Sequence, residues 1–163
     1  MKILTTKEYL ELAYRIDKVI QRRRELAAKH RDSLYGRSID YSNSGGSGGG
    51  NDALGRAVAS VRDYEAETDK IISILVSIRF EIESSINGIS DKMQKEVLTD
   101  RYLLYMPWKN RYDKDTGKLL EQGIKEKMGY SAEAVYKFHS EGLKNISVPE
   151  KITVKYSEIQ YWL

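Results

Sequence analysis

Hydrophobic residues recur at steps of three and four along two long stretches of the chain, which is the spacing of one face of a helix. The first stretch begins at Thr6, a predicted N-cap, and its stripe consists of Tyr9, Leu12, Ala13, Ile16, Val19, Ile20, Leu26 and Ala27. The second has a seam of Val58, Val61, Glu65, Thr68, Ile72, Leu75, Arg79, Ile82, Ile86 and Ile89, with Ile71 and Ile78 at its margin. Because each helix must bury its stripe, residues 6–35 and 53–88 are predicted to pack antiparallel as a coiled-coil hairpin.

The connection between these helices, residues 42–50, has the sequence SNSGGSGGG, which is typical of a flexible linker. Residues 1–50 carry 10 basic and 6 acidic side chains, a net charge of +4, and residues 51–90 carry 4 and 7, a net charge of −3. Opposite charges favour pairing of the two helices, although each exposed ion pair contributes little to the free energy of folding. Polar seam positions such as Arg23 and Thr68 set register or partner choice, so the hairpin is also a candidate homodimer surface.

After Gly88 the pattern predicts a third helix followed by a turn. Ser90 is the predicted N-cap of a helix from Asp91 to about Tyr105, which Met106-Pro107 ends. Its inward residues are expected to be Met93, Val97, Leu98, Tyr102 and Leu104. Residues 108–117 contain Asp and Gly at the spacing of a tight turn, which favours a short β-hairpin or an extended loop.

The pattern from Leu119 onward predicts a helix-turn-helix. A short amphipathic helix is expected to carry Leu119, Leu120, Ile124 and Met128 and to end at Gly129. Ser131 then caps a second helix, from Ala132 to about Ile146, with an apolar face of Val135, Phe138, Leu143 and Ile146. In this arrangement the first helix braces the second, whose N-terminal side chains enter the major groove of DNA. The expected fold is therefore mainly α.

The second helix supplies the candidate base-reading residues, Ala132, Glu133, Tyr136, Lys137 and Ser140. Glu133 has the chemistry to accept from a cytosine amino group, and Lys137 to reach guanine or a phosphate. Contacts to the DNA backbone are expected from Lys109, Arg111, Lys114, Lys118, Lys125, Lys127, Ser131 and Lys144. The predicted partner is double-stranded DNA.

Several of these segments resemble region 4 of sigma factors. They are QKEVLTDRY (94–102), Trp108, IKEKMGYS (124–131), VYKFH (135–139) and GLKNI (142–146). The chain is similar in particular to small phage-encoded sigma-like proteins related to the late-gene activators RinA and ArpU, over most of residues 6–146. The resemblance implies a transcription regulator of phage or mobile-element promoters in the bacterial cytoplasm, acting with host RNA polymerase. It places Ala132, Glu133, Tyr136 and Lys137 where sigma factors read promoter bases.

Two features depart from that family. Residues 111–123 are inserted between the tryptophan and the first motif helix, either as a wing that touches phosphate or as a surface loop. Ala132 and Ala134 stand where arginines are common, so electrostatic binding is expected to be weaker and to depend on dimerisation or on polymerase contacts.

The C-terminal segment has the alternation of a strand. Ile152, Val154 and Tyr156 alternate with polar residues after Pro149. The expected strand packs beside the hairpin of residues 108–120 and covers Trp108 and Tyr112; a docking peptide for a partner is the alternative. The predicted domains are the helical hairpin (1–89), the helix-turn-helix (90–148) and this tail (149–163).

Composition argues against catalysis and leaves two other functions open. The chain has no cysteine, its two histidines, His30 and His139, are far apart, and no phosphate-binding glycine loop appears. A calcium loop starting at Asp113 lacks the required glutamate, having Ile124 at its twelfth position. No enzyme activity, cofactor, metal site or membrane span is expected. The net charge of +3 is too small to establish DNA binding, so a protein–protein adaptor and a small-terminase-like packaging subunit remain alternatives.

Overall fold

The computed structural model describes residues 4–37 and 50–163, and there the predicted mainly helical fold is confirmed. The elements in chain order are α1 (Thr6–Arg37), α2 (Gly50–Asn87), α3 (Lys92–Tyr102), β1 (Arg111–Tyr112), β2 (Leu119–Glu121), α4 (Ile124–Met128), α5 (Ala132–Lys144) and α6 (Glu150–Ile159). The predicted linker, residues 42–50, lies outside the described residues except for Gly50. Two compact units form, unit 1 (Met1–Asp17 with Ser77–Leu163) and unit 2 (Lys18–Val76), and their boundaries fall inside α1 and α2.

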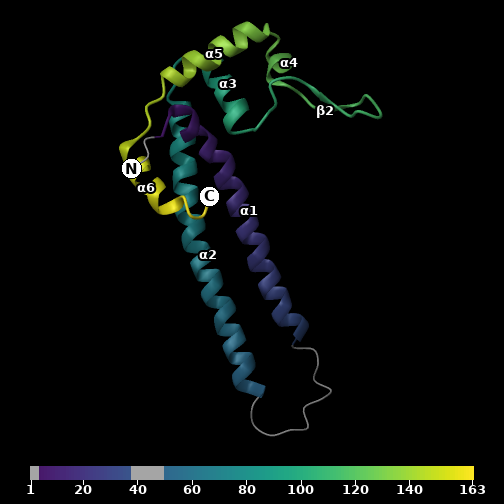
Figure 1. Ribbon diagram of the computed structural model, residues 1–163, viewed down its shortest axis with the longest axis vertical. Coiled ribbons are helices and arrows are strands. Elements are labelled where there is room, and N and C mark those ends of the chain that lie inside the picture. The colour runs from purple at the N-terminus through teal and green to yellow at the C-terminus, as the bar shows by residue number, and fades with distance from the viewer. Residues whose placement is uncertain (1–3, 38–49) are drawn as a thin grey trace. The chain divides into compact units, whose positions relative to one another are not determined.

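Unit 2 consists of the second part of α1 lying beside the first part of α2 (Figure 1). Its buried residues are Ile20, Thr68, Ile71 and Leu75. At its surface the Arg31 guanidinium Nε donates to the Glu65 carboxylate at 2.9 Å. The exposed His30 ring packs on Tyr64, with 4.7 Å between ring centroids. An apolar core, with an ion pair and a ring contact at its edge, thus holds the two helices of this unit together.

In unit 1 the first part of α1 runs antiparallel to the last part of α2. The Tyr9 hydroxyl meets the Ser85 hydroxyl at 3.1 Å, and Arg79 Nε donates to Asp17 at 3.3 Å. From the first pair to the second, the residue number rises on α1 and falls on α2, so the two helices run in opposite directions. The buried apolar residues of the two segments are Tyr9, Leu10, Leu12, Ala13, Ile16, Ile78, Ile82 and Ile86.

The α2 seam differs from the predicted one by a shift of its centre. Ile71 and Ile78 are buried, whereas Ile72 and Arg79 are only half-buried, and Val58 is exposed. Both registers satisfy a seven-residue repeat, so the sequence pattern does not choose between them. The observed register keeps the Arg79 guanidinium at the margin, because a charge placed at the centre of the seam would lose its hydration.

Two helix starts lie one residue from their predicted positions. Thr5 rather than Thr6 caps α1: its hydroxyl accepts from the Glu8 amide at 3.2 Å, while the Glu8 carboxylate accepts from the Thr5 amide at 2.9 Å. This reciprocal pair is a capping box. Asp91 rather than Ser90 caps α3, accepting from the Gln94 amide at 2.8 Å.

The helix α3 ends at Tyr102, three residues earlier than expected. Val97, Leu98 and Tyr102 are buried as predicted, but Leu104 is exposed. The chain turns at Tyr105, whose φ of 58° makes it the one non-glycine residue with positive φ among the described residues. A residue in the left-handed region cannot continue a right-handed helix, so Tyr105 cannot belong to α3 as predicted.

The segment between α3 and α4 contains the predicted β-hairpin. Strands β1 and β2 pair antiparallel, with Arg111 opposite Glu121 and Tyr112 opposite Leu119. The expectation that Leu119 and Leu120 belong to a helix was wrong, because both lie in β2 with exposed side chains. The hairpin extends away from α4 and α5 (Figure 1).

The predicted C-terminal strand was also wrong, since residues 150–159 form the helix α6. Ile152 and Ile159 are fully buried and lie seven positions apart, which places them on one helical face. Lys151 pairs with Glu81 of α2 at 3.0 Å. No strand covers Trp108 or Tyr112 in the described part of the chain; Tyr112 is exposed. Pro149 precedes the helix, a position where its missing amide proton costs little.

Candidate nucleic-acid interface

The predicted helix-turn-helix is present as α4, a three-residue turn and α5. Gly129 ends α4 in the left-handed conformation, with φ of 70°, which glycine adopts without steric cost. The Ser131 hydroxyl then caps α5, accepting from the Ala134 amide at 3.2 Å. Glu133 lies in the first turn of α5, where a carboxylate is favourable beside the helix N-terminus. Local chemistry therefore fixes both ends of the turn.

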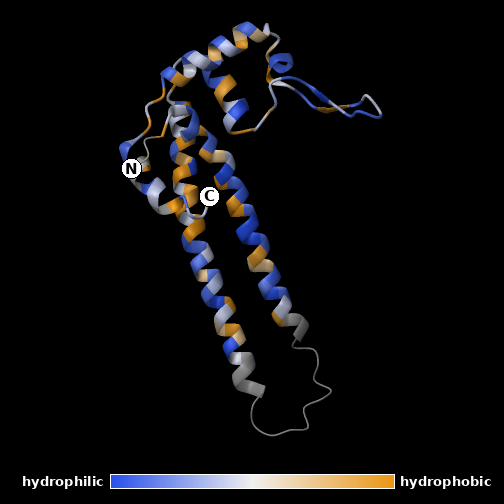
Figure 2. Ribbon diagram, viewed as in Figure 1, coloured by the Kyte–Doolittle hydropathy of each residue, from blue (hydrophilic) through white to orange (hydrophobic). Residues whose placement is uncertain are grey.

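The inner face of α5 is held by α3 and α4. Val97, Ile124 and Val135 form a buried cluster, against which Met106, Trp108, Met128 and Phe138 pack. Figure 2 shows hydrophobic and hydrophilic residues interspersed along α5, as expected for a helix with one buried face. At the far end, Asn145 Nδ2 donates to Gln94 Oε1 of α3 at 2.7 Å. These contacts fix the direction of α5 within unit 1.

Most of the predicted base-reading residues lie on the outer face of α5. Glu133, Tyr136, Lys137 and Ser140 are exposed, and Ala132 is half-buried. The Lys137 ammonium is 4.0 Å from Glu141 one turn later, and the Ser140 hydroxyl donates to the Lys137 carbonyl at 3.0 Å. The five positions thus form a contiguous surface that begins at the helix N-terminus.

The predicted backbone-contact residues fall into three groups. Lys109, Lys114 and Lys118 are exposed on and beside the β-hairpin, where Arg111 instead pairs with Glu121 at 2.9 Å. Two flank α5: Ser131 caps its start and Lys144 is exposed in its last turn. The remaining two, Lys125 and Lys127, are on α4.

Lys127 has a structural contact that the sequence did not indicate. Its ammonium donates to both carboxylate oxygens of Asp100 on α3, at 2.6 and 2.8 Å. The Asp100 side chain is 2 % exposed and that of Lys127 is 35 % exposed. This ion pair ties α4 to α3, so a phosphate contact by Lys127 stays a prediction and would have to share the ammonium with Asp100.

The tip of the hairpin is closed by its own hydrogen bonds. The Asp113 carboxylate accepts from the Asp115 amide at 3.0 Å and from the Thr116 amide at 2.7 Å, and these amides hold the pKa of Asp113 below its ordinary value. Gly117, with φ of 65°, completes the turn. In the described ranges no group of three or more His, Asp or Glu residues is placed to hold a metal ion. Asp113 acts as a turn residue, because its carboxylate accepts from the two amides at the hairpin tip.

Trp108 is the residue that joins α3, α4 and α5, a role that the sequence pattern did not reveal. The Tyr136 ring lies 5.1 Å from it and the His139 ring 5.0 Å, while the Arg101 guanidinium stands 5.1 Å above its face. Arg101 also donates to the Met106 carbonyl at 3.0 Å. A tryptophan immediately after a proline in a helix connection was the available signal, but its neighbours come from distant parts of the chain.

His139 is packed and is uncharged at neutral pH. Its Nε2 lies 3.0 Å from the Tyr102 hydroxyl, and the two rings stack. Burial, with smaller contributions from Lys7 and Arg101, lowers the pKa of His139 to about 4. Burial likewise raises the pKa of Tyr102 to about 12. Both side chains are therefore neutral between these values.

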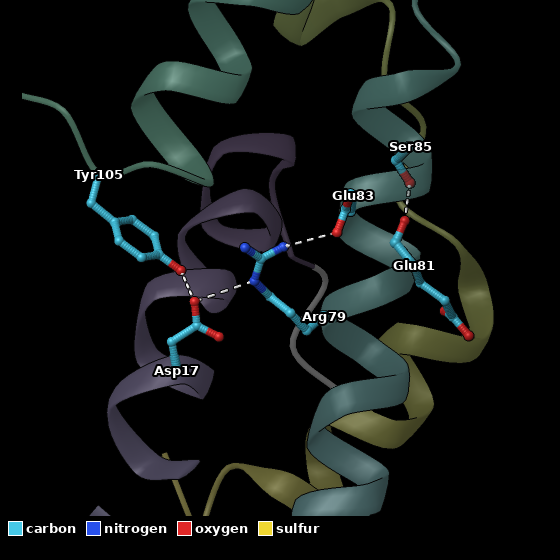
Figure 3. A network of polar contacts seen from close by, with 6 residues as sticks. All are labelled: Asp17, Arg79, Glu81, Glu83, Ser85 and Tyr105. Atoms are coloured by element: carbon cyan, nitrogen blue, oxygen red, sulfur yellow. Dashed lines mark hydrogen bonds and ion pairs between the residues drawn. The ribbon is translucent and has the colours of Figure 1, made fainter. Parts of the chain in front are cut away.

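A second polar network connects the turn after α3 to α1 and α2 (Figure 3). The Tyr105 hydroxyl donates to the Asp17 carboxylate, which also accepts from Arg79 Nε at 3.3 Å. The Arg79 guanidinium lies 3.8 Å from Glu83 one turn later. Burial and the Asp17 carboxylate raise the pKa of Tyr105, so its hydroxyl stays protonated and donates. This network ties the side chain of Tyr105 to α1 and α2.

Comparison of the chain with protein-family models, curated proteins and solved structures yields no match. Among the described residues, no helix has the length and apolar character needed to cross a membrane.

Proposed function

We propose that this protein is a sequence-specific DNA-binding transcription regulator in which α5 reads the major groove. The observation that carries the proposal is the division of α5 into two faces. Val135 faces the cluster with α3 and α4, whereas Glu133, Tyr136, Lys137 and Ser140 are exposed. A helix fixed on one side and polar on the other has the geometry with which a recognition helix meets base edges.

The surroundings of α5 support the same proposal. The capped N-terminus of α5 presents amide groups and the Ser131 hydroxyl, which suit a phosphate next to the groove. Lys125, Lys144 and the hairpin lysines supply further cations. The resemblance to sigma region 4 adds the proposed context, which is a phage or mobile-element promoter in a bacterial cytoplasm, read together with host RNA polymerase or as a homodimer.

The test starts from selection of duplexes from random or genomic fragments, followed by gel-shift titration of the best site. Replacing Lys137 or Glu133 by Gln should change the preferred base at one or two positions, by roughly five- to 150-fold. The matched controls Lys70→Gln and Glu67→Gln change the same charges at exposed positions of α2. Their base preference should equal that of the unmodified protein.

Salt dependence provides an independent measurement. Lys125→Ala should weaken all duplexes alike and reduce the slope of log K against log salt by about 1, because it removes one phosphate contact. If no duplex is selected, or if the α5 variants keep the same base preference as their controls, α5 does not read DNA.

A protein–protein adaptor is the second candidate, and the β-hairpin favours it. Tyr112, Leu119 and Leu120 are 56, 53 and 62 % exposed, an unusual concentration of apolar surface on two short strands. The two candidates separate in one experiment, because an adaptor selects no duplex, whereas the regulator selects one whether or not Leu119 and Leu120 are replaced by Ser.

A further inference from the structure

A cleft of about 470 Å³ lies within unit 1. Its walls come from α1, α3, the segment after α3, and His139 of α5. This volume is within the range of small-molecule sites, which are about 300–1,000 Å³. The lining includes the aromatic Tyr14, Tyr105 and Trp108, and the cationic Lys7, Arg15 and Arg101.

The aromatic walls are held in place by contacts among the lining residues and, at Tyr105, by a hydrogen bond to Asp17 outside the cleft. Tyr14 and Tyr105 meet edge to face, with centroids 5.1 Å apart, and the Tyr105 hydroxyl is bound to Asp17. Trp108 is packed against His139, at 5.0 Å and nearly perpendicular. Rigid aromatic rings that are already ordered lose little conformational entropy when a flat ligand enters. The walls therefore suit a planar aromatic group.

The charged residues of the cleft are predominantly positive. Lys7, Arg15 and Arg101 line it together with a single carboxylate, Glu11, which is 3.9 Å from Lys7. His139 adds no charge at neutral pH. The surplus cations favour an anionic ligand, and the planar guanidinium of Arg15 matches a carboxylate or a phosphate through paired N–H groups.

We propose that this cleft binds a small planar aromatic molecule that carries one anionic group, either a carboxylate or a phosphate monoester. Its ring lies among Tyr14, Tyr105 and Trp108, and its anion pairs with Arg15. The test of this site uses no DNA, so its failure would leave the proposed function of α5 untouched.

The experiment uses Trp108 as the reporter. The chain has two tryptophans, so Trp162→Phe leaves Trp108 as the only one. Fluorescence of this protein, excited at wavelengths where the ligands do not absorb, is titrated at constant ionic strength with phenylacetate, phenyl phosphate and phenylacetamide. Phenylacetamide has the shape of phenylacetate without its charge. The expected result is a saturable change with at least one anion and at least tenfold weaker binding of the amide; the tighter anion identifies the ligand class.

Two arginine variants place the site. Arg15→Gln should weaken anion binding about tenfold while leaving the melting temperature unchanged, because Arg15 is exposed. The control Arg22→Gln removes the same charge from an exposed position of α1 that does not line the cleft, and should bind as the parent does. The proposal is overturned by absence of saturation, by equal affinity for the acid and the amide, or by equal effects of the two arginine substitutions.

Discussion

The close approach of α3 to α5 at Gly142 gives a sharp prediction about what orients the candidate recognition helix. Gly142 is buried in the last turn of α5. A Cβ atom added there would lie 2.9 Å from Leu98 Cδ1 and 3.3 Å from Gln94 Cβ, both on α3. The first distance is shorter than any ordinary carbon–carbon contact, so Gly142→Ala must move α5 or the Leu98 side chain.

Two effects of opposite sign decide the result of Gly142→Ala. Alanine is favoured over glycine inside a helix by about 0.5–1 kcal/mol. Overpacking a well-filled contact costs about 1–3 kcal/mol. The steric term wins, because Leu98 is fully buried and has no free space to enter. We expect a net loss of about 0.5–2 kcal/mol, which lowers the melting temperature by roughly 2–6 °C for a chain of this size.

The assay is thermal and urea unfolding followed by circular dichroism, with Gly55→Ala as the matched control. Gly55 lies in α2, and nothing is within 4 Å of an added Cβ there, so the control should stabilise its helix by about 0.5–1 kcal/mol. In a Leu98→Ala background the closest atom is gone, so Gly142→Ala should no longer lower the free energy of unfolding. The coupling free energy between the two substitutions should be about 1 kcal/mol or more. The α3–α5 contact is refuted if Gly142→Ala alone raises the melting temperature as much as Gly55→Ala does.

Three further predictions follow from the polar contacts of unit 1. The folded-state pKa of His139 is about 4, below the unfolded value near 6.5. The free energy of unfolding should therefore fall by about 1–3 kcal/mol as the pH drops from 6.5 toward 4. His139→Gln should flatten that pH dependence in melting experiments. Lys127→Met should lower the free energy of unfolding, measured in urea, by about 2–4 kcal/mol, because it leaves the buried Asp100 carboxylate unpaired. Adding Asp100→Asn should restore part of the loss. A stability equal to the parent's would mean that the ion pair contributes nothing. Tyr105→Phe removes the hydroxyl that binds Asp17 and should cost about 1–2 kcal/mol by the same measurement, whereas an unchanged stability would show that the network does not hold the turn.

The sequence was sufficient to predict an element where the contacts that determine it are local. Gly129 ends α4 and Ser131 caps α5 as predicted, because the hydrogen bonds that end or begin a helix reach no further than four residues. The β-hairpin was predicted for the same reason, since its turn is closed by Asp113 and Gly117 within five positions. The two long helices, α1 and α2, were predicted from their periodicity. The cap of α1 lies one residue earlier than expected, and the cap of α3 lies one residue later.

Tertiary contacts decided what periodicity left open. The C-terminal residues alternate as a strand would, yet they form a helix that buries Ile152 and Ile159 on one face. In α2 the buried residue is Ile71 and not Ile72, a choice that the seven-residue repeat left open. The pairings of Asp100 with Lys127 and of Tyr105 with Asp17 join residues 27 and 88 positions apart. Such pairs leave no trace in local sequence, because burial and charge pairing are properties of the surface that each side chain meets after the chain has folded.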